Sequence, residues 1–306
     1  MLAAFRKKLR EWCSLALIAG PLLFGVPALE RATAPGRLPA VSAHAMTVSV
    51  FDVGQGDSIL AQEGDRQILI DGGPDATVLE RLGAAMPTGD RSIDLVILTH
   101  PHSDHVDGLV SVLERYEVKR VLMTDVAAPS AYYRRWRELI AEQGMQVDDP
   151  RTVKIERVGD MEYDVLSAGT EAGLRGSIHD GNSDGLNDSS IVGMLKFGSR
   201  RFLMTGDATS AVEDKLMAAK ADLSADFLKV GHHGSNYSTS AEFLAAVAPR
   251  FAATSVGARN AYGNPAWRVM RLLDSSGIAG YRTDLDGTIT AVTDGQSLQV
   301  TSENVR

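Results

Sequence analysis

Cysteine is nearly absent from this chain. Among its 306 residues only Cys13 carries a thiol, and that residue lies in an apolar N-terminal stretch. A single thiol excludes an intrachain disulfide and a cysteine-based zinc cluster. Any metal ion must therefore be bound by His, Asp and Asn side chains. Histidine is itself scarce, with 7 copies, and Phe, Trp and Tyr together make up only 6% of the residues.

Positive charge is also in short supply, because 31 Lys and Arg face 39 Asp and Glu for a formal net charge of −8. The first 34 residues hold five basic and two acidic side chains, so the rest of the chain carries −11. An acidic body argues against a broad electrostatic surface for nucleic acid, although a local basic groove stays compatible with it. A small-molecule or phosphodiester substrate fits this balance. The sequence predicts no particular oligomeric state.

Long unbroken apolar runs are lacking as well. The N-terminal apolar segment 13–29 is interrupted by Gly and Pro, follows four basic residues at 6–10, and precedes the small-residue site Ala32-Thr33-Ala34. This order predicts a secretory signal peptide over 1–34, with an N-terminal membrane anchor as the alternative. We expect a linker over 35–45, one folded domain over 46–306, and an exported protein, periplasmic or secreted. A true start at Met46 is a further alternative.

The chain does contain a repeated pattern in which a short apolar run ends in a polar cluster. The pattern occurs at residues 48–58, 68–73, 95–107, 201–207 and 227–235. Each run predicts a buried strand that delivers polar side chains at its carboxyl end, where α/β sheets place their sites. Helical patterns lie at 76–86, 106–116, 131–143, 209–220, 241–247 and 264–275. This alternation predicts a layered α/β fold, with the irregular segment 173–188 as a loop over the site.

The densest polar cluster follows Leu98. Three histidines and an aspartate lie within six positions there: His100, His102, Asp104 and His105. Buried polar atoms without partners cost about 1–3 kcal/mol each, so four such groups at the mouth of a buried strand indicate a bound ligand. Imidazole and carboxylate are ligands that borderline divalent metals prefer. We expect His100 and His102 to bind one ion, and Asp104 and His105 to face a neighbouring one.

Two later clusters offer further ligands. Asp207 follows the run 201–204, and its carboxylate is the best candidate to bridge two ions, a helix cap being the alternative. His232 and His233 follow the run 227–230. Because neighbouring side chains of an extended backbone lie on opposite faces, we expect only one of them to bind metal. We favour His233 as the ligand, and His232 as a group that contacts substrate or orients a ligand.

Five motifs follow one another along the chain. They are Asp52-Val53-Gly54-Gln55-Gly56-Asp57-Ser58, Leu69-Ile70-Asp71-Gly72-Gly73, Thr99-His100-Pro101-His102-Ser103-Asp104-His105, Thr205-Gly206-Asp207 and Gly231-His232-His233-Gly234-Ser235. In this order they resemble the metallo-β-lactamase superfamily, and more narrowly the metallo-β-lactamase-like domain of ComEC-type DNA-uptake proteins and its free-standing relatives. The resemblance covers about residues 46–290. It implies an α/β fold, a four-layer αββα sandwich with the metal site at one edge.

The resemblance also implies a set of ligands. Two divalent ions are expected, Zn²⁺ in the first place and Mn²⁺ as the alternative. His100 and His102 would bind the first ion and His105, His233 and Asp104 the second, with Asp207 between them. Asp71 would be a carboxylate that orients the histidine loop, and Asp57 would hydrogen-bond nearby loop backbone.

One position departs from the superfamily pattern. A third histidine usually stands about twenty residues before the bridging aspartate, and this chain has Asn187 at that place, 20 residues before Asp207. An amide oxygen is a weaker zinc ligand than imidazole. The ComEC-like branch also tends to have Asn there, so the departure agrees with that branch. Asn187 is expected to bind metal or substrate, an ordinary loop residue being the alternative.

The function implied is hydrolysis by metal-activated water, whose pKa falls from about 15.7 to about 7 on a bound ion. Asp104 would orient the water or take its proton, while His232 and Ser235 would contact the electrophilic group. Arg259 is a candidate to meet a phosphate, with ordinary surface polarity as the alternative. A phosphodiesterase or nuclease is favoured. A lactone, lactam or thioester hydrolase of the same fold, and a non-catalytic metal-binding subunit, are the alternatives.

Overall fold

The computed structural model describes residues 44–169 and 185–304. The predicted signal peptide or anchor over 1–34 lies outside these residues, as do most of the linker and of the irregular segment 173–188. Within the described part of the chain, no helix is both long and apolar enough to cross a membrane.

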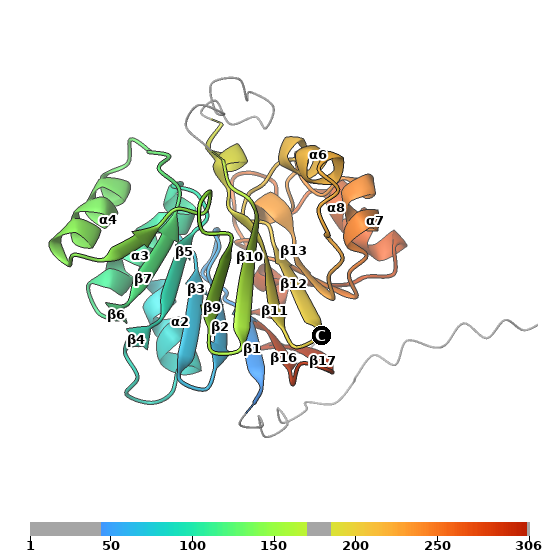
Figure 1. Ribbon diagram of the computed structural model, residues 1–306. Coiled ribbons are helices and arrows are strands. Elements are labelled where there is room, and N and C mark those ends of the chain that lie inside the picture. Colours follow the sequence, from blue (N-terminus) through green and yellow to red (C-terminus); the bar gives the residue numbers. More distant parts are fainter. Residues whose placement is uncertain (1–43, 170–184, 305–306) are drawn as a thin grey trace, which may run out of the picture. The chain divides into compact units, whose positions relative to one another are not determined.

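Two large sheets form the centre of the domain (Figure 1). The first contains, in spatial order, β17 (Leu298–Ser302), β16 (Ile289–Thr293), β1 (Met46–Val50), β2 (Ile59–Glu63), β3 (Arg66–Ile70), β5 (Leu95–Leu98), β7 (Arg120–Met123) and β8 (Gln146–Asp148). The second contains β15 (Ala279–Arg282), β14 (Phe251–Thr254), β13 (Phe227–Lys229), β12 (Arg200–Met204), β11 (Val192–Phe197), β10 (Met161–Ser167) and β9 (Ile155–Val158). A short pair, β4 (Ser92–Ile93) and β6 (Glu117–Val118), stands apart.

Each sheet is part parallel and part antiparallel, and the parallel part of each carries the helices. Strands β3, β5, β7 and β8 pair in parallel in the first sheet, and β12 to β15 do so in the second. Helices α2 (Thr77–Ala85), α3 (Ser103–Leu113) and α4 (Ala131–Glu142) cover the outer face of the first sheet, and α6 (Ser210–Ala218), α7 (Ala241–Val247) and α8 (Trp267–Ser275) cover that of the second (Figure 1). Short helical turns are η1 (Leu186–Ser189), η2 (Gly231–Gly234) and α9 (Thr283–Asp286).

The apolar runs of the sequence are explained by burial on both faces of the sheets. In β3, Ile68 and Ile70 belong to the core between the sheets, whereas Leu69 belongs to the core under α2, α3 and α4. The same alternation occurs in β5, where Leu95 and Ile97 face the other sheet. Parallel strands with helices on one side and a sheet on the other need such continuous apolar runs. Since a third core lies between the second sheet and its helices, the predicted four-layer αββα sandwich is confirmed.

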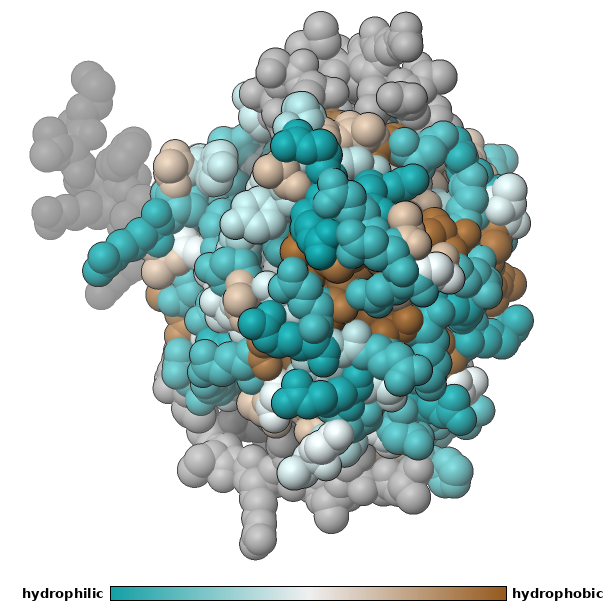
Figure 2. Space-filling model, turned by 90° about the vertical axis from the view of Figure 1, so that its left-hand side faces the viewer, coloured by the Kyte–Doolittle hydropathy of each residue, from teal (hydrophilic) through white to brown (hydrophobic). Residues whose placement is uncertain are grey.

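The outer surface of the first helical layer is largely hydrophilic, with smaller hydrophobic areas (Figure 2). Helix α4 shows how this arises, because Tyr133 and Trp136 on one side of it are buried. On the other side, the Arg135 guanidinium lies 3.4 Å from Glu138 and 3.0 Å from Glu142. Arg135 therefore belongs to a solvated face of the helix and is ion-paired within it.

Two helices begin three residues away from their predicted starts. Helix α3 starts at Ser103 rather than at 106, because the extended backbone of His102 (φ −69°, ψ 152°) ends the loop and serves as the N-cap. Asp104 and His105 therefore lie in the first helical turn and not in the loop. Helix α8 starts at Trp267 rather than at 264, because Ala266 is still extended (φ −64°, ψ 138°).

Candidate metal centre

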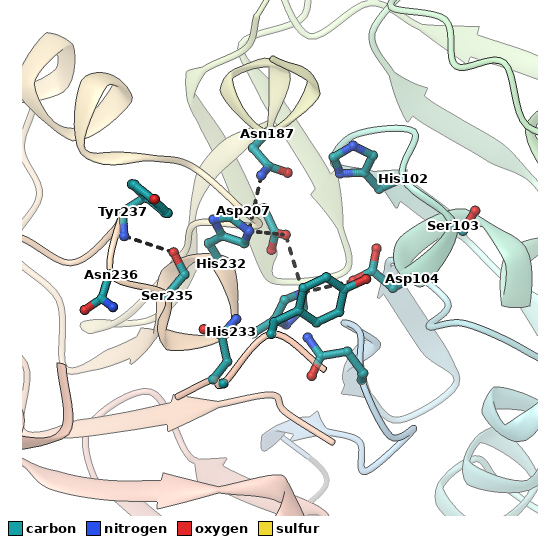
Figure 3. Close-up of a pocket in the computed structure, with 14 residues that line it drawn as sticks. His102, Ser103, Asp104, Asn187, Asp207, His232, His233, Ser235, Asn236 and Tyr237 are labelled. Carbon is teal, nitrogen blue, oxygen red and sulfur yellow. Dashed lines mark hydrogen bonds and ion pairs between the residues drawn. The ribbon is translucent and has the colours of Figure 1, made fainter. Parts of the chain in front are cut away.

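Side chains from both sheets meet at one edge of the domain, beyond the carboxyl ends of the strands (Figure 3). The first sheet supplies Asp71 after β3 and the segment 100–105 after β5. The second supplies Asp207 after β12 and the pair 232–233 in η2, after β13. The arrangement follows the general placement of sites at strand carboxyl ends, and it brings the five polar clusters of the sequence together.

One donor cluster combines Asp104 and His105 with Asp207 and His233, whose ligand atoms all lie within 4.8 Å of one another. His105 Nε2 and His233 Nε2 are each 3.4 Å from Asp207 Oδ2. Asp104 Oδ2 is 3.2 Å from His233 Nε2. Two atoms that bind one zinc ion tetrahedrally at about 2.0–2.1 Å lie about 3.3 Å apart. The spacing of this cluster therefore fits a single ion.

A second donor cluster lies on the other side of Asp207. His100 Nε2 and His102 Nδ1 are 3.0 Å apart, and His100 Nε2 is 3.9 Å from Asp207 Oδ2. The same carboxylate oxygen thus faces both clusters. Asp207 is held in place by its backbone N–H, which donates to Ser190 Oγ at 3.1 Å. Its position between two groups of imidazoles is the one expected of a bridging ligand, a role that stays a prediction.

The three buried rings of the centre share one hydrogen-bonding pattern. His105 Nδ1 donates to Asp71 Oδ2 at 2.8 Å, and His233 Nδ1 donates to the Ser255 carbonyl at 3.0 Å. His100 Nδ1 lies 3.1 Å from Thr99 Oγ1, which itself donates to Asp71 at 2.7 Å. When Nδ1 carries the proton, Nε2 keeps its lone pair for a metal ion.

Asp71 is the carboxylate behind this arrangement. It is fully buried with φ 57° and also accepts the Thr99 backbone N–H at 2.8 Å. Its contacts fit the orienting role that the resemblance implies, because it fixes the loop backbone at Thr99 and the ring of His105. Asp71 is not among the described residues that line the cleft, so its contacts reach the cleft through Thr99 and His105.

Charge in the centre is balanced locally. Burial alone would raise the pKa of Asp207, but the His233, His105 and His232 rings outweigh burial and hold this pKa well below its usual range. Burial alone would lower the pKa of His233, but the Asp207 and Asp104 carboxylates raise it well above its usual range. Burial and the neighbouring His105 and His102 rings lower the pKa of His100 well below its usual range. The Asp207 carboxylate therefore stays ionised in a buried place.

A buried ion pair supports the centre from behind, and the sequence pattern did not lead to it. Lys229 is 0% exposed, and its Nζ lies 2.8 Å from Asp57 Oδ2. Asp57 Oδ1 is in turn 3.5 Å from His233 Nδ1. The resemblance implied that Asp57 hydrogen-bonds loop backbone; its backbone N–H does donate to the Asp104 carbonyl at 3.2 Å, but its side chain pairs with the lysine. The available signal was a lysine within the apolar run 227–230.

The expectation that His232 and His233 lie on opposite faces of an extended backbone is wrong. Both residues have left-handed backbone conformations, with φ 48° and 52°. Non-glycine residues of this kind cost about 1–3 kcal/mol each and persist where the surrounding structure enforces them. As a consequence both rings face Asp207, with His232 Nε2 3.9 Å and His233 Nε2 3.4 Å from Asp207 Oδ2.

The centre opens into a cleft of about 610 Å³. Asn187 and Ser235 line this cleft, as predicted for substrate contacts, whereas Arg259 is exposed and is not among the described residues that line it. Tyr262 also lines the cleft, and further lining residues that the sequence did not single out as substrate contacts are Gln55, Asn236, Tyr237 and Asn264. They come from three separate loops, and their sequence positions carry no metal-ligand signal. The loop after η2 is anchored by Arg268, whose guanidinium donates to the Thr239 carbonyl at 3.0 Å.

The donor set fits divalent metal ions. Among the described residues, the Nε2 atoms of His105 and His233 and Oδ1 of Asp207 are buried and have no hydrogen-bond partner. Unsatisfied buried nitrogen and oxygen atoms of this kind each cost about 1–3 kcal/mol, which a bound cation would offset. Imidazoles and carboxylates without thiolates suit Zn²⁺ and also Mn²⁺. The number and identity of the ions stay predictions.

Comparison with known proteins agrees with this architecture. The sequence profile of the Metallo-beta-lactamase superfamily matches residues 51–257. Competence protein ComA of Neisseria gonorrhoeae is 31% identical over 258 residues, covering 83% of this chain and 33% of that protein. ComE operon protein 3 of Bacillus subtilis (strain 168) is 29% identical over 260 residues, covering 79% of this chain and 32% of that protein. The chain thus spans about a third of the length of these relatives.

Among solved structures, the metallo hydrolase Igni18 from the archaeon Ignicoccus hospitalis superposes with a TM-score of 0.51. The sequence identity is 15%, and the match covers 80% of this chain and 98% of that one. At this identity the similarity concerns the fold alone. Since the superfamily profile covers more than half of the chain, and both sheets place its motifs around one centre, the chain belongs to the metallo-β-lactamase superfamily of metal-binding hydrolases.

Proposed function

We propose that the protein is a metal-dependent phosphodiester hydrolase of the ComEC-like, nuclease type. The observation that carries this proposal is the position of Asp207, whose carboxylate faces one donor cluster on each side within a cleft. Two adjacent divalent ions are the usual arrangement for displacement at phosphorus, because they stabilise the attacking and the leaving oxygen together. A site that binds a single ion would not stabilise both oxygens together.

The bound ions would supply an activated water and take up charge that develops on the substrate oxygens. Asp104 is the protein group best placed to handle the proton. Its side chain is 29% exposed, against 3% for Asp207, and lies at the border between the donor cluster and the cleft. A carboxylate in that position can orient the water and accept its proton, provided the pair lies within hydrogen-bond reach.

The lining of the cleft supports a substrate that is bound through the ions and through neutral groups. None of the described lining residues is Lys or Arg. Two tyrosines of the lining are unusually open, Tyr237 with 46% and Tyr262 with 75% exposure. Exposed aromatic rings beside a phosphodiester site suit stacking against a base. Binding that depends little on Lys and Arg should also depend little on salt.

The relatives also support nucleic acid as the substrate. One of them is named a competence protein and another a ComE operon protein, and the chain spans about a third of each. We extend the proposal to single-stranded nucleic acid, or another exported phosphodiester, as substrate. Export itself is part of the proposal and rests on the basic and apolar residues of 1–34, with membrane attachment through that segment as the only membrane contact expected.

The test uses the full chain, stripped of metal by a chelator and reloaded with Zn²⁺ or Mn²⁺. The substrates are bis(p-nitrophenyl) phosphate, single-stranded DNA and a chromogenic cephalosporin. We expect cleavage of the two phosphodiesters that needs metal and disappears in Asp207→Asn. Asp65→Asn is the matched control, because this aspartate is 89% exposed in the turn between β2 and β3.

Turnover of the cephalosporin alone would replace the proposal by a lactam hydrolase of the same fold. Tight binding of metal without turnover of any substrate would favour the non-catalytic alternative. Cleavage that persists in Asp207→Asn would show that the activity comes from elsewhere.

A further inference from the structure

The donor cluster of His100 and His102 lacks a third imidazole at its usual place, and another imidazole lies beside the gap. Asn187 occupies the position twenty residues before Asp207, and its Nδ2 is 3.2 Å from His232 Nε2. His232 comes from η2, after β13, whereas Asn187 comes from η1 before β11. Two distant segments of the chain therefore converge where a third nitrogen ligand of the first ion would be expected.

The distance of His232 from Asp207 supports its inclusion in that cluster. His232 Nε2 lies 3.9 Å from Asp207 Oδ2, the distance that also separates His100 Nε2 from this oxygen. His233 Nε2 is 3.4 Å from the same oxygen but also 3.2 Å from Asp104, and so belongs to the other cluster. Figure 3 shows the His232 ring between Asn187 and Asp207.

The backbone offers an independent argument. Two successive non-glycine residues with φ near 50° are a strained arrangement. The conformation is stabilised by backbone hydrogen bonds, in which His232 N–H donates to the Gly206 carbonyl at 3.1 Å and Ser235 N–H to the His232 carbonyl at 2.8 Å. Its consequence is that both rings reach one carboxylate, which an extended backbone would prevent.

We infer that His232 Nε2 is the third nitrogen ligand of the first ion, beside His100 and His102, and that His233 serves the second ion. Each ion then takes two donors from the first sheet and, counting the shared Asp207, two from the second. Asn187 becomes a neighbour of the ligand rather than the ligand itself, and its Nδ2, 3.2 Å from His232 Nε2, must turn away when an ion binds, because a metal-bound nitrogen accepts no hydrogen bond. The inference rests on the proposed metal binding, but it does not depend on which bond the enzyme hydrolyses.

The experiment counts metal ions rather than turnover. The full chain and the variants His232→Ala, His233→Ala and Asn187→Ala are stripped of metal and titrated with Zn²⁺. Bound metal is measured by mass spectrometry, and affinities by competition with a chromophoric chelator. Asp65→Asn is the control, because this aspartate is 89% exposed in the turn between β2 and β3 and lies outside the cleft lining.

We expect two ions in the wild type, the control and Asn187→Ala. In His232→Ala the affinity for one ion should fall by about 10–100-fold or more, because even the loss of a residue that only orients a ligand costs this much. The affinity for the other ion should stay unchanged. Cd²⁺ gives a second readout, because only one of two ¹¹³Cd resonances should move in His232→Ala, and the other one in His233→Ala. The double variant Asn187→His, His232→Ala should regain the weakened ion, since it restores a third imidazole from the other segment.

The inference is overturned if His232→Ala binds two ions with unchanged affinity, if Asn187→Ala loses an ion, or if the wild type binds fewer than two. Near-UV circular dichroism checks the fold of each variant. Should His232→Ala not fold, the titration of His232→Gln decides in the same way. Wild-type protein that binds two ions but cleaves no phosphodiester would refute the proposed function and leave this count of ligands intact.

Discussion

Lys229→Met is the substitution whose effect follows most directly from the structure. Lys229 lies in β13 of the second sheet, is fully buried, and pairs with Asp57 at 2.8 Å. Asp57 belongs to the loop between β1 and β2 of the first sheet and is 1% exposed. The methionine has a similar length and leaves little cavity, but it leaves the Asp57 carboxylate buried next to His233 without its cation.

The size of the effect is set by this uncompensated charge. Removing one partner of a buried ion pair costs about 3–5 kcal/mol, which is a large part of a typical stability of about 5–15 kcal/mol. The same change in a half-exposed pair costs at most about 1 kcal/mol. Lys196→Met is therefore the matched control, because Lys196 is 30% exposed and pairs with Glu162 at 3.4 Å.

The assay is urea unfolding of metal-free protein at pH 7, so that any effect on metal affinity stays separate. We expect a loss of about 3–5 kcal/mol in Lys229→Met. The double variant with Asp57→Asn should be more stable than Lys229→Met alone, because the orphaned charge is gone. A loss below about 1 kcal/mol, or no recovery in the double variant, would refute the reasoning.

The dependence on pH has a definite sign. Burial alone would raise the pKa of Asp57, but Lys229 and His233 outweigh burial and lower this pKa. A lowered folded pKa contributes stability above the unfolded value of about 3.9, and this contribution disappears as the pH falls through the folded pKa. Lys229→Met lacks the contribution, so its deficit relative to the wild type should shrink as the pH is lowered below about 4.

Three further substitutions test separate contacts. Asp71→Asn removes the charged partner of His105, and the affinity for one ion, measured by zinc titration, should fall about 10–100-fold; unchanged affinity would contradict the orienting role. Tyr163→Phe removes a buried hydroxyl without a hydrogen-bond partner among the described residues. Urea unfolding should show equal or higher stability, by up to about 1–3 kcal/mol. A clear loss of stability would instead reveal a hydrogen-bond partner of the hydroxyl. Gly108→Ala would place a Cβ 1.9 Å from the Gly72 carbonyl oxygen. Thermal unfolding should therefore show a free energy of unfolding lower by about 1–3 kcal/mol, even though alanine has a helix propensity better than that of glycine by about 1 kcal/mol.

The strands that carry the site were predictable because they are buried on both faces. The runs before Asp71, His100 and Asp207 are continuous and apolar, the run before His232 is interrupted only by Lys229, and each coincides with a strand of the structure. The layered fold followed from their alternation with helices. The pairing of strands that are distant in the sequence could not be predicted in this way. Strand β1 pairs with β16 across more than two hundred residues, and no local pattern specifies such a pairing.

Local backbone conformation limited the prediction of the site. The adjacent pair His232 and His233 stood out by composition, but its geometry depends on two positive φ angles that composition does not determine. An extended backbone, in which neighbouring side chains point to opposite faces, was the natural assumption. It predicted that only one of the two histidines faces the metal centre, whereas both do. Arg259 is exposed and is not among the described residues that line the cleft, so its role as a phosphate contact stays a prediction. A charge in a loop predicts affinity for phosphate but not the direction of the side chain.

The centre joins the two sheets, and this explains why a buried ion pair is found behind it. Asp104 and His105 come from the first sheet, and Asp207 and His233 from the second, so a bound ion would stabilise the contact between them. Without metal, the ionised carboxylates and the orphaned nitrogens would leave this junction poorly satisfied. Lys229 and Asp57 connect the same two sheets through a charge pair that needs no metal. The pair therefore allows the donor atoms to be held in position before an ion arrives, which lowers the ordering cost of binding.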